Sequence, residues 1–449
     1  MATDKQLKFE RIAEQVERWR EELGVPGATF GLRVAGETYA GGVGLTHVEH
    51  PLPVTDETIF QIGSITKTVT ATAMMRLVER GQLDLQAPVR TYLPDFRVRD
   101  EEVSERVSVW HLLTHRAGWT GDVFTDTGGG DDAAARYVDG MADFEQLAPL
   151  GQHFSYNNAS FCVAGRIVEV LTDATYEEAL RELIFEPLGM ERSFLIPDQV
   201  MPHRFAVGHE SAKDGDRVLS PWAIPRGMNA AGGICCHIHD LLRYGACHLG
   251  DGSPLLRPES LAEMHKRQTP SLPYMGWCGL AWMISGESGE TRLWHTGGTN
   301  GQNAVLTLVP DQQLALGMMT NGDKGTALYD RFNKAVLREF CDIAIAEPRA
   351  VESSAEELAQ YVGRYRGTMW EIDLRMDEGR LLADFRYHGG FPSDKELTDM
   401  PPVEVARCGP DQLLVLAGHF EGTRADFLRD EAGEICYLRF GSRLNPRQD

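Results

Sequence analysis

The sequence lacks long apolar runs and paired cysteines. No stretch of the 449 residues approaches the run of about 18 uncharged apolar residues that a membrane span needs. The first residues, MATDKQLKFERIAEQVERWREELG, carry charge every few positions and lack the apolar segment of a secretory signal. The eight cysteines are scattered without CxxC spacing, which is typical of reduced thiols in the cytosol. We therefore expect a cytoplasmic protein without disulfides.

Positive charge is also scarce. The chain has 44 Lys and Arg against 66 Asp and Glu, which gives a formal net charge of -22. Such a surface repels phosphate backbones and anionic lipid headgroups, so we expect neither nucleic acid nor a membrane as a partner. Hydrophobic residues make up 42% of the chain, a usual share for a globular protein. The composition predicts a soluble globular chain of more than one domain, and no particular oligomeric state.

Several functional motifs are absent. Neither GxSxG nor GxGxxG occurs, which argues against an α/β-hydrolase and a dinucleotide-binding fold. His111 and His115 have the i, i+4 spacing of a zinc pair, but no glutamate follows the first histidine as in HExxH. The run from Cys235 to Asp240 contains two cysteines and two histidines, but neighbouring positions at the start of a helix point in different directions. We predict no metal and no cofactor.

The apolar spacing predicts strands near both ends of a long first unit, with helices between them. Helical spacing occurs over residues 5–22 and 64–79, and helical patterns are enriched from about 100 to 230. Strand-like runs cover residues 28–34, 38–43, 280–284, 291–295, 302–309 and 314–319. These patterns predict an α/β unit over residues 1–343, with one antiparallel sheet assembled from distant segments, flanking helices and a helical insert at about 80–230.

The pattern changes after residue 343. Residues 344–356 are rich in small and polar side chains and predict a linker. Beyond it, short apolar runs follow one another at close spacing, and two pairs of them are joined by glycine-containing turns. These runs cover residues 371–376, 380–385, 412–416, 424–428 and 435–440. They predict a small antiparallel β domain over residues 357–449, a barrel or a sandwich, of which we favour the barrel.

The strongest local signal for chemistry is a serine that precedes a lysine by three positions. Ser64 is the only serine of the chain with this spacing, and it lies at the start of the helical segment 64–79, where Lys67 shares its face. A serine hydroxyl becomes a nucleophile when a base takes its proton, and a lysine serves as that base when burial lowers its pKa. The alternative is a serine that caps the helix beside a solvated lysine.

Two further segments carry side chains suited to acyl transfer. Tyr156 and Asn158 lie in a loop before an apolar helix, and a tyrosine beside a lysine can shuttle a proton. The alternative is a buried tyrosine with capping asparagines. At the end of a strand, His295 is followed by Thr296 and glycines, which let a substrate approach and leave an N–H group free for an oxyanion. The alternative there is an ordinary turn.

Taken in order, Ser64-x-x-Lys67, Tyr156-x-Asn158 and His295-Thr296-Gly297 resemble the three motifs of the serine β-lactamase and penicillin-binding-protein superfamily. Flanking segments look like its class C-like branch, which includes DD-peptidases, D-aminopeptidases and family VIII carboxylesterases. These segments are HLLTHRAGW (111–119), EPLGM (186–190) and AGGI (231–234). The resemblance covers about residues 8–340. The segment YVGRYRG (361–367) looks like the lipocalin-like domains appended to some D-aminopeptidase-like and peptide-cyclising members.

The resemblance implies a role for each motif residue. Ser64 would be the acylated nucleophile, with Lys67 and Tyr156 as its activating pair and His295 as a further catalytic residue. The remaining positions would bind the substrate or its oxyanion: Asn158, Thr296 and Gly297 by contact with the substrate, and the backbone N–H groups of Ser64 and Gly298 as the oxyanion hole.

One departure from the family pattern bears on the substrate. Class C β-lactamases usually carry lysine where this chain has His295, so a permanent cationic anchor for a β-lactam carboxylate is missing. We therefore expect a serine hydrolase of small esters, or of amides and peptides. The alternatives are a β-lactamase or DD-carboxypeptidase, a peptide cyclase, and a catalytically idle penicillin-recognising sensor. Because Lys67 and Tyr156 are both present, the enzyme is favoured over the sensor.

Overall fold

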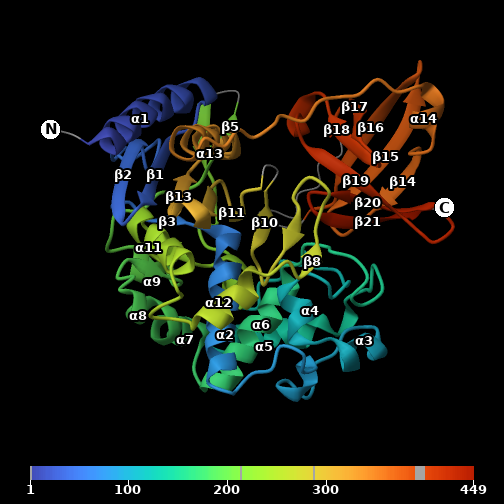
Figure 1. Cartoon of the computed structure of the whole chain (residues 1–449). Helices are drawn as coiled ribbons and strands as arrows, with labels where there is room; N and C mark the ends of the chain where they lie inside the picture. Colours follow the sequence, from blue (N-terminus) through green and yellow to red (C-terminus); the bar gives the residue numbers. More distant parts are fainter. Residues whose placement is uncertain (1–2, 213–214, 287–288, 390–399, 449) are drawn as a thin grey trace.

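The structure is a computed structural model that describes residues 3–212, 215–286, 289–389 and 400–448. An antiparallel sheet lies between two layers of helices, and a β-barrel stands beside it (Figure 1). The predicted fold class, an α/β unit followed by a small antiparallel barrel, is confirmed. Among the described residues, no helix is both long and apolar enough to cross a membrane.

The main sheet has eight strands in the order β2-β1-β13-β12-β11-β10-β9-β8, and every neighbouring pair is antiparallel. Its strands are β1 (Gly27–Val34), β2 (Glu37–Gly44), β8 (Thr269–Pro270), β9 (Trp277–Cys278), β10 (Met283–Ser285), β11 (Arg292–Gly298), β12 (Asn303–Val309) and β13 (Leu314–Thr320). Ala28 pairs with Thr320, so the N-terminal hairpin lies beside the last strand of the unit. The predicted assembly of one sheet from distant segments is confirmed.

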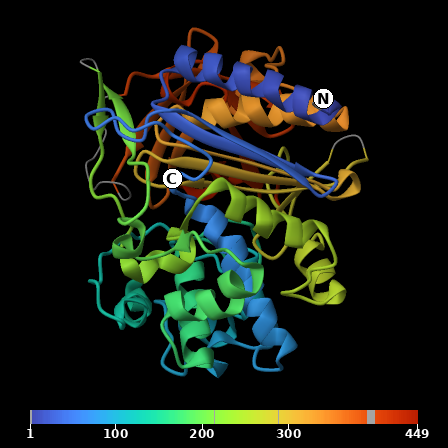
Figure 2. The ribbon, with the colours of Figure 1, turned by 90° about the vertical axis from the view of Figure 1, so that its left-hand side faces the viewer.

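Two helices cover one face of this sheet: α1 (Asp4–Leu23) and α13 (Gly325–Cys341) (Figure 2). The Thr3 side chain caps the start of α1, and Gly24 ends the helix in the left-handed conformation with φ of 68°. Between helices and sheet, the Phe30 ring lies 5.9 Å from that of Phe9 and 5.6 Å from that of Phe332. These buried aromatic contacts attach both helices to the sheet.

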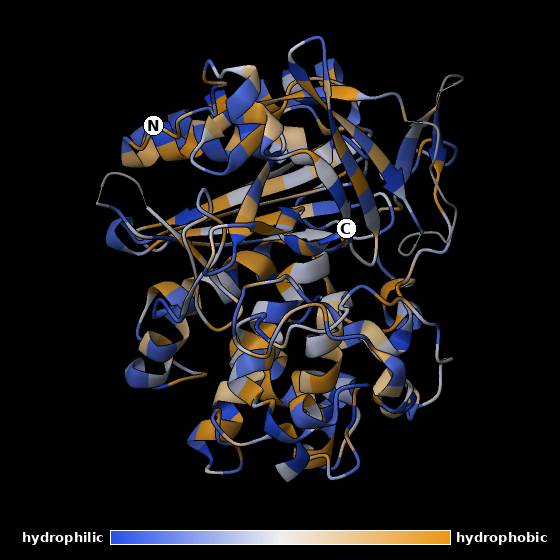
Figure 3. Ribbon diagram, turned by 90° about the vertical axis from the view of Figure 1, so that its right-hand side faces the viewer, coloured by the Kyte–Doolittle hydropathy of each residue, from blue (hydrophilic) through white to orange (hydrophobic). Residues whose placement is uncertain are grey.

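The opposite face is covered by the helical insert and the helices that follow it. They are α2 (Thr66–Glu79), α3 (Glu101–Arg106), α4 (Val109–Leu113), α5 (Ala133–Asp139), α6 (Ala159–Thr172), α7 (Tyr176–Leu180), α8 (Glu186–Leu188), α9 (Pro197–Val200), α10 (Asn229–Gly232), α11 (Ile238–Leu249) and α12 (Pro258–His265). Two small sheets join them, β3 (Phe60–Gln61) with β7 (Cys235–Cys236) and β4 (Ser193–Phe194), and β5 (His209–Ala212) with β6 (Gly215–Val218). Hydrophobic residues gather along the sheet and inside the helical layer (Figure 3). Helix α2 runs through the centre of this layer and is buried along most of its length.

The C-terminal strands close into an eight-stranded antiparallel barrel. They are β14 (Gly363–Arg366), β15 (Trp370–Asp377), β16 (Arg380–Tyr387), β17 (Val403–Gly409), β18 (Gln412–Val415), β19 (Arg424–Arg429), β20 (Ile435–Phe440) and β21 (Arg443–Gln448). A short helix, α14 (Ala355–Ala359), precedes them. The five predicted strand segments correspond to β15, β16, β18, β19 and β20, whereas β14, β17 and β21 were not predicted. Residues 342–354 contain neither helix nor strand, and the domain boundary at 344–356 stays our prediction.

The barrel contacts the larger unit directly. The Tyr274 hydroxyl donates to the carbonyl oxygen of Arg424 at 2.8 Å, and the Arg424 guanidinium lies 4.2 Å from the centre of the Tyr274 ring. The backbone N–H of Tyr156 donates to the carbonyl oxygen of Ser442 at 2.8 Å. Because Tyr156 is a predicted site residue, these contacts bring the barrel to the site.

Candidate active site

Ser64 lies where strand β3 passes through a short 3₁₀ turn, η1 (Gly63–Ile65), into helix α2. Gly63 has φ of 51°, a conformation that side chains other than glycine rarely adopt. A Cβ at this position would also lie 2.6 Å from the backbone nitrogen of Gly298. The glycine therefore permits both the sharp turn before Ser64 and the close approach of strand β11.

Lys67 lies in the first turn of α2, directly beside the serine. Its Nζ donates to Ser64 Oγ at 3.0 Å and to the carbonyl oxygen of Ala231 at 2.6 Å. The side chain is fully buried. Burial disfavours the ammonium form and lowers the pKa of Lys67 to about 7. A neutral amine is therefore available near neutral pH to accept the proton of Ser64, which is the role predicted for Lys67.

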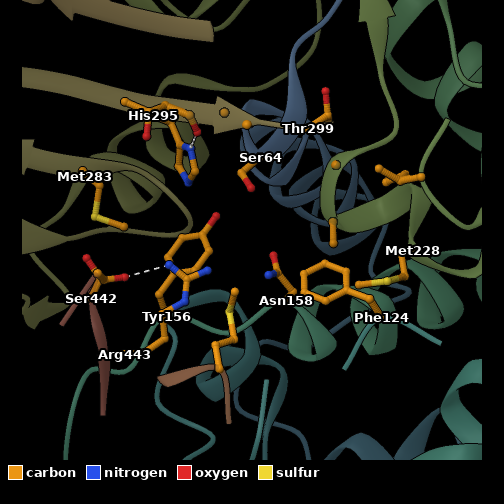
Figure 4. Close-up of a pocket in the computed structure, with 18 of the residues that line it drawn as sticks. Ser64, Phe124, Tyr156, Asn158, Met228, Met283, His295, Thr299, Ser442 and Arg443 are labelled. Atoms are coloured by element: carbon orange, nitrogen blue, oxygen red, sulfur yellow. Dashed lines mark hydrogen bonds between the residues drawn. The ribbon is translucent and has the colours of Figure 1, made fainter. Parts of the chain in front are cut away.

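Tyr156 lies at the end of the loop before α6, and its hydroxyl points toward Ser64 (Figure 4). The ring centre is 5.0 Å from Lys67 Nζ. Burial raises the pKa of the Tyr156 phenol, whereas the Ser64 hydroxyl and the positive charge of Arg443 lower it. The structure thus brings together Ser64, Lys67 and Tyr156, as predicted.

His295 faces the same space from strand β11, with its ring centre 6.0 Å from that of Tyr156 (Figure 4). Burial, together with the charge of Lys67, lowers the pKa of His295 to about 3, so the ring is neutral. Its Nδ1 lies 2.6 Å from the carbonyl oxygen of Thr296, which can only accept a hydrogen bond. The proton therefore sits on Nδ1, and the buried Nε2 is an acceptor without a partner among the described residues.

The rest of the third motif packs against the serine turn. A Cβ at Gly297 would lie 1.8 Å from the carbonyl oxygen of Ile62 and 2.9 Å from the nitrogen of Ser64. A Cβ at Gly298, by contrast, would meet no atom nearer than 3.7 Å. Only glycine at position 297 lets β11 run this close to the nucleophile. The assignment of the Ser64 and Gly298 N–H groups to an oxyanion hole stays a prediction.

These residues line a cleft of about 400 Å³, and most of its remaining wall is apolar. Its lining includes Ser64, Tyr156, Asn158 and the segment from His295 to Gly298, which contains Thr296 and Gly297. The apolar wall is formed by Phe124, Ile224, Met228, Met275, Met283, Trp294 and Met369. The flexible methionine side chains suit a cleft that accepts apolar groups of different shape.

Three residues at this site were not predicted: His115, Asp122 and Arg443. His115 stacks on Tyr156 with ring centres 4.4 Å apart, and its Nδ1 accepts the N–H of Asn157. Asp122 accepts the Asn158 amide at 2.6 Å and holds Arg443, which comes from the barrel strand β21. The HLLTHRAGW segment was a signal for His115, but only as part of a family resemblance. No local pattern pointed to Arg443.

Of the histidines considered for metal binding, His111, His115 and His237 have other contacts, whereas His239 belongs to a group with the spacing of metal ligands. The Nδ1 of His111 contacts the Ser108 hydroxyl at 2.8 Å, and the Nδ1 of His115 accepts the N–H of Asn157. His237 caps helix α11, and its Nδ1 accepts the N–H of Asp240. Among the described residues, two groups have the spacing of metal ligands: His47 with Glu49 and His50, and Asp56 with Glu57 and His239. Neither group lines the cleft.

Comparison with known proteins gives consistent results. The family model described as Beta-lactamase matches residues 10–338. Penicillin-binding protein 4 of Amycolatopsis lactamdurans is 33% identical over 358 residues, which cover 76% of this chain and 94% of the relative. Esterase EstB of Burkholderia gladioli is 32% identical over 267 residues, or 51% of this chain and 66% of the relative. The crystal structure of SurE, at 24% identity, superposes with a TM-score of 0.77 over 99% of this chain and 100% of its own, which shows a common fold that includes the barrel.

Proposed function

Because the chain belongs to the beta-lactamase family, whose model matches residues 10–338, we propose that it is a serine hydrolase that acts through an acyl-enzyme on small carboxylic esters or amides. The observation that carries this proposal is the contact between Lys67 and Ser64. An amine whose pKa is about 7 lies 3.0 Å from a serine hydroxyl that opens into a cleft. That arrangement supplies a base for the nucleophile at neutral pH.

In the proposed reaction, Ser64 Oγ bonds to the carbonyl carbon of the substrate and its proton passes to the Lys67 amine, directly or through Tyr156. The tetrahedral intermediate then collapses, the bond to the leaving oxygen or nitrogen breaks, and the leaving group takes a proton from the Tyr156–Lys67 pair. Water attacks the acyl-enzyme by the same steps in reverse and releases the acid. The N–H groups of Ser64 and Gly298 would hold the oxyanion in both halves.

The neutral His295 favours esters and amides over β-lactams. A lysine at this position would present a cation to a substrate carboxylate, whereas the neutral, buried ring of His295 carries no charge. Among relatives, esterase EstB supports esters as a substrate class. Penicillin-binding protein 4 is named for binding a β-lactam, which is the alternative that the cephalosporin tests.

Three substrates test the proposal: a p-nitrophenyl ester, a D-amino-acid amide and a chromogenic cephalosporin. We expect faster turnover of the ester or the amide than of the cephalosporin, and a covalent adduct on Ser64 that intact-mass measurement detects. Ser64→Ala abolishes both, whereas Ser353→Ala, a serine far along the chain outside the cleft, retains them. Absence of both adduct and turnover with all three substrates would refute the hydrolase. Faster turnover of the cephalosporin would instead favour the β-lactamase.

A further inference from the structure

The tip of the barrel hairpin β20–β21 enters the cleft. Its two turn residues, Gly441 and Ser442, have φ of 54° and 69°, and such a pair of positive φ angles is typical of a two-residue type I′ turn. The Ser442 carbonyl accepts the N–H of Tyr156 at 2.8 Å, and the Leu444 N–H donates to Ser155 Oγ at 3.2 Å. The hairpin is therefore attached by hydrogen bonds to the segment that carries Tyr156, and the intervening residue, Arg443, is held at the site.

Arg443 forms a tight ion pair with a buried carboxylate. Its Nε and Nη2 donate to the two oxygens of Asp122 at 2.9 and 3.2 Å, and its Nη1 donates to the carbonyl oxygen of Gly441 at 2.7 Å. The Asp122 side chain is only 3% exposed, and the same carboxylate accepts the Asn158 amide at 2.6 Å. One carboxylate thus fixes a barrel arginine and a residue of the second motif.

The guanidinium also lies against the Tyr156 ring, 4.8 Å from its centre. Three other basic groups surround this ring: Lys67, His115 and His295. Burial lowers the pKa of each of these three, whereas the charge and hydrogen bonds of Asp122 outweigh burial and raise the pKa of Arg443. Of the four basic groups, Arg443 alone keeps its charge well above pH 7.

We propose that Arg443 is a positioning residue of the active site: fixed by Asp122, it holds a permanent positive charge beside the Tyr156–Lys67 pair, the charge that position 295 does not supply in this chain. The barrel is then part of the catalytic apparatus. This inference rests on the proposed function, since it assigns Arg443 a role in the activation of Ser64. The role is exerted through Tyr156 and Lys67, because the guanidinium lies against the Tyr156 ring and is held there by Asp122 and the Gly441 carbonyl.

The positive charge of Arg443 should affect the pKa of Lys67, whose neighbours come from several elements of the fold. Three groups that contact or neighbour the amine are Ser64 of its own turn, Tyr156 of the loop and Cys162 of α6. The charged or basic groups around it are Asp122, His115, His295 and Arg443. The charge of Arg443 lowers the pKa of Lys67, and that of Asp122 raises it. In Arg443→Met the cation is lost and the Asp122 charge is left unbalanced, so both changes raise the pKa of Lys67.

The test compares full-length Arg443→Met, Arg443→Lys and a matched control, Arg447→Met, which removes an arginine from the same strand outside the cleft. We expect the pH midpoint of ester acylation to rise by about one pH unit in Arg443→Met, equal to about a tenfold loss of rate at pH 6. In Arg443→Lys the pH midpoint should return most of the way to the wild-type value, and in Arg447→Met it should equal the wild-type value. A rate loss with an unchanged midpoint would reveal a merely structural role and overturn the proposal.

A second measurement does not depend on turnover. The Lys67 amine is titrated by NMR of ¹³Cε-labelled lysine in the Ser64→Ala protein, and its signal is assigned by its loss in Ser64→Ala/Lys67→Met. The expected result is the same upward shift when Arg443→Met is added, and an unchanged titration would overturn the proposal. A wild-type chain that never acylates refutes the hydrolase, while this titration still decides whether Arg443 acts on Lys67.

Discussion

The buried lysine predicts how acylation depends on pH. With an ordinary pKa of 10.5, about 0.03% of a lysine would be neutral at pH 7, whereas with a pKa of about 7 about half of it is neutral. Burial thus raises the population of the active base by about three powers of ten. The neutral amine accepts the Ser64 proton and the ammonium form cannot, so acylation is lost as the pH falls.

We expect the kcat/KM for a p-nitrophenyl ester to fall about tenfold per pH unit below 7 and to level off above 7. At pH 5 about 1% of Lys67 is neutral, so the rate should be about a hundredfold below its plateau. The assay is the burst of p-nitrophenol in a stopped-flow instrument between pH 5 and 9, because the burst reports acylation without deacylation.

The neighbouring histidines do not account for the expected pH midpoint near 7, which we assign to Lys67. The pKa of His295 is about 3, so this ring does not titrate between pH 5 and 9, and burial holds the pKa of His115 well below its usual value. Lys67→Arg serves as the control, because its guanidinium stays protonated and should abolish the burst at every pH in this range. A flat profile in the wild type, or the same midpoint in Lys67→Arg, would refute the reasoning.

The pH dependence of the free energy of unfolding tests the lowered pKa of Lys67 independently of activity. Because the pKa of Lys67 is lower in the folded chain than in the unfolded chain, the unfolded state binds more protons between about pH 7 and 10.5. The free energy of unfolding should therefore rise with pH across this window, and Lys67→Met should lack this contribution. Urea titrations of both proteins at pH 7 and 9 measure the difference, and parallel pH dependence would contradict a lowered pKa.

Three further predictions concern the third motif and the core. Gly297→Ala should reduce ester turnover at least a hundredfold, because its Cβ would lie 1.8 Å from the Ile62 carbonyl oxygen. Gly298→Ala, whose Cβ would meet no atom nearer than 3.7 Å, should retain most of the activity, and equal losses in the two variants would contradict this geometry. His295→Gln should reduce kcat/KM without moving the pH midpoint, because His295 is neutral throughout the assay; a shifted midpoint would show that the ring titrates. Phe332→Ala should cost about 3–5 kcal/mol in urea unfolding and preserve specific activity, since this buried ring packs on the far face of the sheet; a loss below 1 kcal/mol would contradict its place in the core.

The parts of the site that could be predicted are those encoded by local spacing. Ser64 and Lys67 are three residues apart on one helical turn, so their contact follows from helix geometry alone. Short apolar runs likewise predicted six of the eight strands of the main sheet, whereas β8 and β9, with two residues each, were not predicted. The way the three motifs converge depends on the tertiary fold, and it was anticipated only through the resemblance to a known superfamily.

Arg443 could not be predicted, for two physical reasons. Strand β21 has the sequence RLNPRQ, in which a proline and polar residues leave little strand signal, and its place is set by the closure of the barrel. Its partner Asp122 lies 321 residues away along the chain, in a loop without regular structure. Neither residue has a local pattern, so only the packed structure relates them.

The charge of this site depends on both residue type and burial. Four basic side chains surround the Tyr156 ring, yet burial without an acidic partner favours the neutral form of Lys67, His115 and His295. The fourth, Arg443, keeps its charge because a guanidinium has a pKa far above neutral, and the two oxygens of Asp122 raise that pKa further. It follows that Asp122→Asn should lower the pKa of Lys67, since a negative charge is removed, whereas Arg443→Met should raise it. Opposite shifts of the acylation midpoint in these two variants would distinguish an electrostatic coupling from a loss of packing, which would disturb both variants in the same direction.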